Sequence, residues 1–246
     1  MYMHKILFSL HPVLFRTGLV WLTFLPLFLP AFEFRILSWY GSLDGLFIME
    51  GPERRPLQGS EQRLSPPYNA DGESIIIYRE ARVEGDSVPV PVATLPLPGF
   101  RSAILVISQD ARNPERVSGV WLNDSKRTFP VGSFVFHNLS EHTVALQAVD
   151  EVHVLPSRGN WSRRFGRDAR SARVTALVRD GDVQRAILNS NLKVHGDYRV
   201  IFIFRNGRAS MANSDQIDSP VEFIMLYDYK EPDIQINEGE QRITGS

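Results

Sequence analysis

From residue 35 onward, short apolar runs alternate with turn residues. The runs are five to eight residues long and rich in β-branched and aromatic side chains, as in SIIIYR at 74–79 and YRVIFIFR at 198–205. Such runs, bounded by Gly, Asp, Asn or Pro, are typical of β-strands, and no stretch has convincing helical apolar spacing. The pattern predicts strands at 35–40, 46–50, 74–79, 103–108, 117–123, 132–139, 143–149, 151–155, 173–178, 183–188, 198–205 and 221–227.

This number of short strands predicts an all-β fold, an antiparallel β-sandwich. Because more than about nine strands favour two sheet systems or two modules, we expect two immunoglobulin-like modules at 32–110 and 111–229, divided within Gln109–Arg116. Asp180-Gly181 has the chemistry of a hairpin turn. The proline-rich stretches 51–69 and 88–99 read as long loops, which cannot contain central strands.

The first 32 residues have a different pattern. Lys5 and Arg16 precede a nearly unbroken apolar run at 19–32, LVWLTFLPLFLPAF. The run is shorter than the roughly 20 residues of a membrane-spanning helix, and Pro26 and Pro30 would break its second half. A basic start followed by a short apolar run is typical of a signal peptide.

We therefore expect residues 1–31 to be a signal peptide cleaved after Ala31, so that the protein is exported to the periplasm or the cell exterior. The alternative is an uncleaved membrane anchor, if the apolar stretch back to Ile6 also inserts. In either case the membrane is contacted only through this leader. The polar tail at 230–246 is expected to be disordered.

The composition excludes several classes of function. The net charge is −1 for the whole chain, and the part after the leader has 25 basic and 28 acidic residues. Such a body has no general attraction for nucleic acid. The absence of cysteine excludes disulfides, thiolate metal sites and cysteine nucleophiles.

No recognisable catalytic or cofactor-binding motif is present. The chain lacks nucleotide-binding glycine-rich loops and the G-x-S-x-G serine motif, so neither a cofactor nor enzymatic activity is predicted. His137, His142, His153 and His195 lie after the leader without the spacing of metal ligands, so no metal site is predicted. A pair of carboxylates that meets only in three dimensions stays possible.

The most distinctive polar segment is SRGNWSRRFGRDARSAR at 157–173, whose local charge is +5. Aromatic rings beside guanidinium groups suit phosphate, sulfate or uronate ligands. The alternative is a solvated loop whose arginines pair with carboxylates elsewhere. The candidate anion-binding residues are Arg158, Trp161, Arg163, Arg164, Arg167 and Arg170, and Phe165 could add a second stacking surface. Formal glycosylation sequons begin at Asn123, Asn138 and Asn160.

Several stretches carry a resemblance to a known group. TFPVGSFVFHNLSEHTVAL at 128–146, YRVIFIFRNG at 198–207, VEFIMLYDY at 221–229 and LPLP at 95–98 together resemble an uncharacterised group of exported bacterial β-sandwich proteins. The resemblance implies a leader followed by two β-modules. Its motifs are turns and strand aromatics, so it implies no activity.

The sequence thus predicts an exported, non-catalytic β-sandwich protein with a structural or binding role in the periplasm or cell envelope. Its expected partner is an envelope polysaccharide or another envelope protein. One alternative is a carbohydrate-binding accessory protein or a β-sandwich hydrolase. Another is polyanion binding through the arginine-rich loop 157–173.

Overall fold

The computed structural model describes residues 32–40, 43–83, 86–109, 113, 116–166, 168–180, 182–207 and 219–229. The predicted leader and tail lie outside these ranges. The described residues form sixteen strands and no helix, and so contain no helix that could cross a membrane. The strands are β1 (Phe32–Tyr40), β2 (Leu46–Glu50), β3 (Glu53–Pro56), β4 (Tyr68–Ala70), β5 (Ser74–Val83), β6 (Asp86–Pro96), β7 (Ser102–Gln109), β8 (Val117–Asn123), β9 (Ser133–Asn138), β10 (Val144–Ala148), β11 (Glu151–Leu155), β12 (Asn160–Arg164), β13 (Ser171–Asp180), β14 (Val183–Lys193), β15 (Tyr198–Asn206) and β16 (Val221–Tyr229).

The predicted all-β class is confirmed, and each of the twelve predicted strands overlaps an observed one. The interpretation of 51–69 and 88–99 as loops is wrong, because β3, β4 and most of β6 lie there. Together with β12, these are the strands that the pattern missed, and all four lie at sheet edges. An edge strand pairs on one side only, so it tolerates proline and needs no apolar run.

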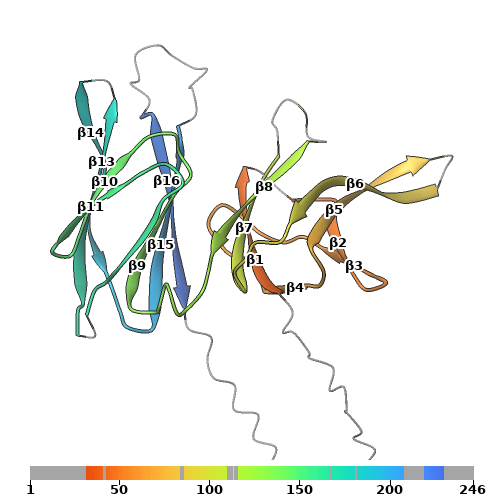
Figure 1. Cartoon of the computed structure of the whole chain (residues 1–246), viewed down its shortest axis with the longest axis horizontal. Coiled ribbons are helices and arrows are strands. Elements are labelled where there is room, and N and C mark those ends of the chain that lie inside the picture. The colour runs from red at the N-terminus through yellow and green to blue at the C-terminus, as the bar shows by residue number, and fades with distance from the viewer. Residues whose placement is uncertain are drawn as a thin grey trace, which may run out of the picture. The chain divides into compact units, whose positions relative to one another are not determined.

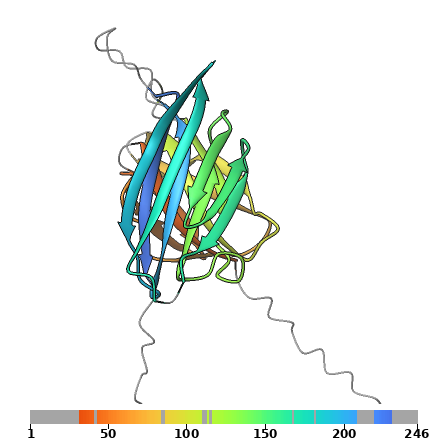
Figure 2. The same ribbon diagram turned by 90° about the vertical axis from the view of Figure 1, so that its left-hand side faces the viewer.

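The strands form four mostly antiparallel sheets (Figure 1). Their strand orders are β4-β1-β7-β8 in sheet I, β3-β2-β5-β6 in sheet II, β12-β9-β15-β16 in sheet III and β11-β10-β13-β14 in sheet IV. The pairs β1–β7 and β9–β15 are parallel, which the sequence did not predict. Sheet IV faces the viewer in Figure 2. The strands β13 and β14 pair antiparallel up to Asp180 and Val183, as the predicted hairpin requires, and Gly181 itself lies outside the described residues.

The pairing pattern of the first eight strands is repeated by the second eight. Adding eight to each strand number converts the orders of sheets I and II into those of sheets III and IV. The register agrees as well, since Ala103 of β7 pairs with Asn123 just as Val200 of β15 pairs with Tyr227. The segments VSGVWLND at 117–124 and VEFIMLYD at 221–228 therefore occupy equivalent positions.

Three apolar clusters hold the sheets together. Sheets I and II enclose one core around Phe34 and Ile77, and sheets III and IV enclose another around Phe136 and Val174. A third cluster joins sheet I to sheet III and includes Ile104. Because successive residues of a strand point to opposite faces, β7 contributes to the first core and to this middle core alternately.

The contacts place all the described residues in one compact unit. The expected division at 110/111 falls between β7 and β8, which are neighbours in sheet I. In the repeated pattern, β8 is the last strand of the first set. A break between the two sets of strands therefore lies after Asn123 rather than within Gln109–Arg116.

The hairpins β2–β3 and β10–β11 are equivalent, and both have a two-residue turn. The first turn residue is Gly51 in one hairpin and Val149 in the other, with φ of 59° and 62°. A positive φ at this position only is the pattern of a type II′ turn, which favours glycine. A β-branched residue is strained in this conformation, so Val149 stores unfavourable energy.

We expect Val149→Gly to raise the free energy of unfolding by about 1 kcal/mol, since relief of the strain exceeds the entropic cost of a new glycine. Urea denaturation measures the change. The matched control is Gly51→Val, where an added Cβ meets no atom within 4 Å, so any loss of stability comes from the backbone conformation. A less stable Val149→Gly variant contradicts the interpretation.

Candidate functional site: a groove beside β8

The structure separates the arginines of the segment 157–173. In β12, Arg163 and Trp161 pair with Phe134 and Phe136, whose side chains belong to the core between sheets III and IV. Arg164 is exposed and, by strand alternation, lies on the opposite face of β12. Arg170 is exposed after β12, whereas Arg167 lies outside the described residues.

Arg163 is already paired. Its guanidinium lies 2.5 Å from a carboxylate oxygen of Asp150 and 3.0 Å from a carboxylate oxygen of Glu151. The hydrogen bond from Arg163 lowers the pKa of the exposed Asp150 carboxyl. This part of the segment therefore has the paired arrangement that the sequence left open as the alternative to an anion site.

The aromatic residues of the segment do not offer free stacking surfaces. The Trp161 ring is stacked between two others, His153 with ring centres 4.8 Å apart and Phe136 at 5.4 Å. Phe165 is buried, with its ring centre 5.1 Å from that of Phe134. Protein rings thus contact Trp161 and Phe165, an arrangement that does not favour stacking of a ligand on them, and the role of Trp161 in anion binding stays a prediction.

Arg158 is placed differently, at the mouth of a groove of about 650 Å³. It has a positive φ of 60°, and its backbone N–H donates to the Asn138 carbonyl at 2.7 Å. One wall of the groove is the edge strand β8, and the other comes from β9, β12 and the turn between β11 and β12. The lining residues are Phe100, Gly119, Val120, Trp121, Leu122, Asn123, His137, Leu139, Arg158, Gly159 and Asn160.

A second hollow, of about 490 Å³, shares Phe100 and Asn123 with the groove and extends its charged surface. It adds Arg101, Lys126 and Glu33 to the lining. Three cations and one carboxylate thus line the two hollows. No described residue forms an ion pair with Arg158, Arg101 or Lys126.

The amide side chains of the groove are Asn123 and Asn160, which the sequence singled out only as sequons. Asn160 is exposed, and the side-chain amide oxygen Oδ1 of Asn123 accepts a hydrogen bond from the Ser125 N–H at 2.9 Å. Amide groups beside apolar side chains suit hydroxyl-rich ligands. The sequence could not reveal this convergence, because it joins β8 to β12 across two sheets.

His137 lies at the floor of the groove and is only 3% exposed. Burial, together with the nearby charge of Arg199, lowers the pKa of its imidazole to about 4. The imidazole is therefore neutral at physiological pH and adds no charge to the groove. Its ring packs against Phe129, with ring centres 5.4 Å apart.

The densest polar group is a buried arginine–aspartate cluster between sheets I and III, formed by Arg35, Asp124, Arg199 and Asp228. Arg35 lies 2.7 Å from Asp124 and 2.5 Å from Asp228, and Arg199 bonds to both aspartates. Burial alone would raise the pKa of Asp228, but its bonds and charge interactions with Arg35 and Arg199 outweigh this and lower it. Two cations balance two anions, so the cluster joins the sheets rather than receiving a charged ligand.

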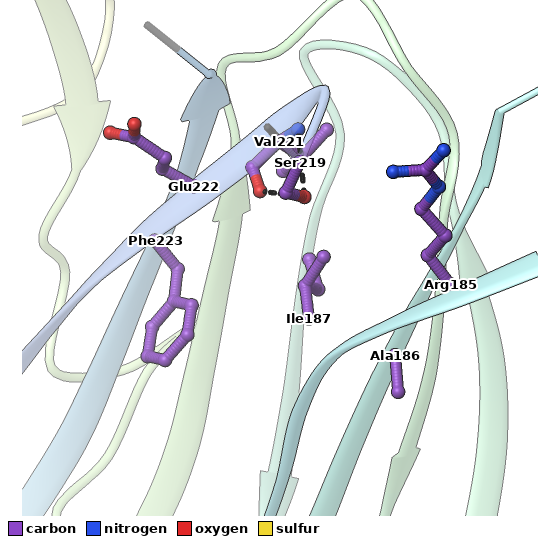
Figure 3. A pocket seen from close by; sticks show the side chains of 7 residues that line it. All are labelled: Arg185, Ala186, Ile187, Ser219, Val221, Glu222 and Phe223. Carbon is purple, nitrogen blue, oxygen red and sulfur yellow. Dashed lines mark hydrogen bonds between the residues drawn. The ribbon is translucent and has the colours of Figure 1, made fainter. Parts of the chain in front are cut away.

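Another hollow lies between β14 and β16, with a volume of about 510 Å³ (Figure 3). Figure 3 shows Arg185 and Glu222 on opposite sides of Ile187. The Ser219 hydroxyl is bonded within its own turn and donates to the Val221 carbonyl at 2.6 Å. This hollow shares no residue with the groove beside β8.

Asn138 is fully buried and organises the end of β9. Its amide nitrogen donates to three carbonyls, including those of His142 at 2.7 Å and Pro156 at 3.0 Å. Its amide oxygen accepts from the N–H and the hydroxyl of Ser140. The side chain of this sequon asparagine therefore has a structural role in the folded protein.

No group of three or more metal-ligating side chains occurs among the described residues. Neither a family model nor a curated protein sequence matches the chain. The resemblance to exported bacterial β-sandwich proteins therefore stays a prediction.

Proposed function

We propose that the protein is an exported, non-enzymatic binding protein of the cell envelope, and that its groove beside β8 holds an acidic polysaccharide. The observation that carries the proposal is a group of three cations that form no ion pair with any described residue, Arg158 in the groove and Arg101 and Lys126 in the adjoining hollow. A ligand with carboxylate or sulfate groups supplies the missing charge.

The other residues that line the groove favour binding of a saccharide over binding of a small inorganic anion. Asn123 and Asn160 can exchange hydrogen bonds with hydroxyl groups, while Phe100 and Val120 offer apolar contact to sugar rings. An open groove accepts a polymer at any point along its length. The polymer is therefore expected to run beside β8, past Arg158 at one end and Lys126 at the other.

The proposed architecture of the protein is two β-sandwich modules, each formed by one set of eight strands. Immunoglobulin constant-type domains have the strand orders ABED and CFG, whereas the orders here are β4-β1-β7-β8 and β3-β2-β5-β6. We therefore propose a distinct eight-stranded sandwich in place of the immunoglobulin-like one. Export rests on the leader 1–31, and the start of the mature chain tests it directly.

We expect the double variant Arg158→Ala/Lys126→Ala to bind polygalacturonate at least about tenfold more weakly than the unchanged protein, because each lost charged contact is worth roughly 1.5 kcal/mol or more. Isothermal titration calorimetry at two salt concentrations measures the loss. Binding should also weaken with added salt, as expected for exposed charges.

The matched control is Arg82→Ala, because Arg82 is an exposed cation near the end of β5 and outside the groove. It should bind as the unchanged protein does. An equal loss of affinity in both variants means a general charge effect and contradicts binding in the groove. Binding of neutral amylose with the same affinity points instead to a general carbohydrate-binding accessory, and release of reducing ends points to a hydrolase.

A further inference from the structure

The strand β11 is an open edge of sheet IV, and two of its three exposed side chains, Val152 and Val154, are apolar. Val152 is 69% exposed and Val154 is 61% exposed, the largest exposures among its apolar residues. The equivalent edge strand β3 has Arg54 and Pro56 at these positions. Arginine and proline protect a strand edge against pairing with another chain, whereas valine favours pairing.

The hydrogen-bonding groups of the two edges differ in the same way. The residues that flank a two-residue turn form a hydrogen-bonded pair, so Glu151, His153 and Leu155 bond inward to β10. The N–H and C=O groups of Val152 and Val154 therefore point outward. In β3, Pro56 has no N–H, and its carbonyl already accepts the Tyr68 hydroxyl at 2.9 Å.

We propose that β11 pairs with β11 of a second copy of this chain, antiparallel and across a two-fold axis at His153. In this register Val152 lies opposite Val154 of the second copy, and Val154 lies opposite its Val152. Each copy presents two N–H and two C=O groups, and all of them find partners. The sheets of the two copies join into one continuous sheet.

The charges near the axis permit this pairing. Glu151 comes opposite Leu155 of the second copy, so no two carboxylates face each other. Glu151 also lies 3.0 Å from the Arg163 guanidinium of its own chain, which neutralises it. The valines then pack against one another across the axis, which favours a second copy over a charged or proline-rich partner strand.

Because the chain has no cysteine, a single introduced cysteine supplies the only thiol that can form a disulfide. Directly opposed residues of a non-hydrogen-bonded pair have Cβ atoms about 4.5–5.5 Å apart, near the separation that a disulfide spans. His153 is the residue that faces itself across the axis. We expect full-length His153→Cys to form a disulfide-linked dimer under mild oxidation, seen by non-reducing electrophoresis, while its counterpart on β3, Arg55→Cys, forms no disulfide-linked dimer.

A second variant places on β11 the arginine and the proline that protect the edge of β3. Val152→Arg/Val154→Pro in the His153→Cys background changes only outward-pointing groups, so the hairpin should fold, which circular dichroism checks. The two substitutions should reduce the amount of disulfide-linked dimer at least about tenfold, because two of the four backbone hydrogen bonds and the valine contacts are lost.

Sedimentation equilibrium of the cysteine-free chain should show dimers at concentrations on the order of 100 µM, as expected for a small interface. A monomer at that concentration overturns the proposal. So does equal crosslinking by the β3 and β11 cysteines, or a dimer that survives the two edge substitutions.

Discussion

Replacement of Arg199 by methionine should lower the free energy of unfolding by about 3–5 kcal/mol, because it leaves buried carboxylates without a partner. Arg199 is 1% exposed and donates to Asp228 at 2.7 Å, to the Phe129 carbonyl at 2.9 Å and to Asp124. Methionine fills most of the volume but supplies no hydrogen bond. Arg35 alone then faces two carboxylates, and the cluster acquires a net negative charge in an apolar surrounding.

Urea denaturation measures this loss, and Arg54→Met is the matched control. Arg54 lies 2.5 Å from Glu80, but both side chains are largely exposed, so its loss should cost less than about 1 kcal/mol. Adding Asp124→Asn to Arg199→Met should recover part of the stability, because it removes the orphaned charge. If Arg199→Met costs no more than Arg54→Met, the cluster does not hold the sheets together.

Acid should destabilise the fold well above the pH at which aspartates titrate, and His137 is the reason. Its pKa is about 4 in the folded protein, compared with 6.5 for an ordinary histidine. Between these values the unfolded chain binds a proton that the folded chain does not, so stability falls as the pH falls. The loss between pH 6.5 and pH 4 should reach about 3 kcal/mol.

The control for this effect is His137→Leu, since Leu37 occupies the equivalent position of β1. The variant should lose less stability than the unchanged protein as the pH falls from 6.5 to 4, with urea midpoints taken at several pH values. The lowered pKa of Asp228 adds an acid loss only below its ordinary range, so the two effects separate. Identical pH curves for the two proteins contradict a neutral, buried His137.

The central strands could be predicted from sequence because burial on one or both faces leaves a strong pattern. YRVIFIFR at 198–205 and AILVIS at 103–108 are apolar because β15 and β7 face a core on each side. The edge strand β6 has no such pattern, and its prolines at 89, 91 and 96 favoured a loop. Parallel pairing of β1 with β7 leaves no local signal, because the pairing depends on the path of the whole chain.

The candidate site could be predicted only in fragments. Arg158, Arg163 and Arg164 are close in sequence, but β12 directs Arg163 and Arg164 to opposite faces, and Arg158 precedes the strand. Asn123 and Lys126, which complete the groove surface, lie far from these arginines in sequence. If β12 had been predicted as a strand, the alternation of its side chains would have predicted that Arg163 and Arg164 lie on opposite faces.

The repeated strand pattern was the signal that the sequence reading overlooked. LFIMEGPERRPL at 46–57 and VALQAVDEVHVL at 144–155 have the same spacing of strand, turn and strand. The two hairpins share a glutamate just after the turn and a leucine at the end. A comparison of the two halves would have predicted β3 from β11, despite its arginines and proline.

The buried arginine–aspartate cluster also sets the order of events in folding. Arg35 lies in the first described strand and Asp228 in the last, and 193 positions separate them in sequence. Sheets I and III therefore cannot close over their common core until nearly the whole chain is available. Sheets I and II enclose their own core from residues that precede Asn123, so the middle layer between sheets I and III is the last part of the fold that can form as the chain is made.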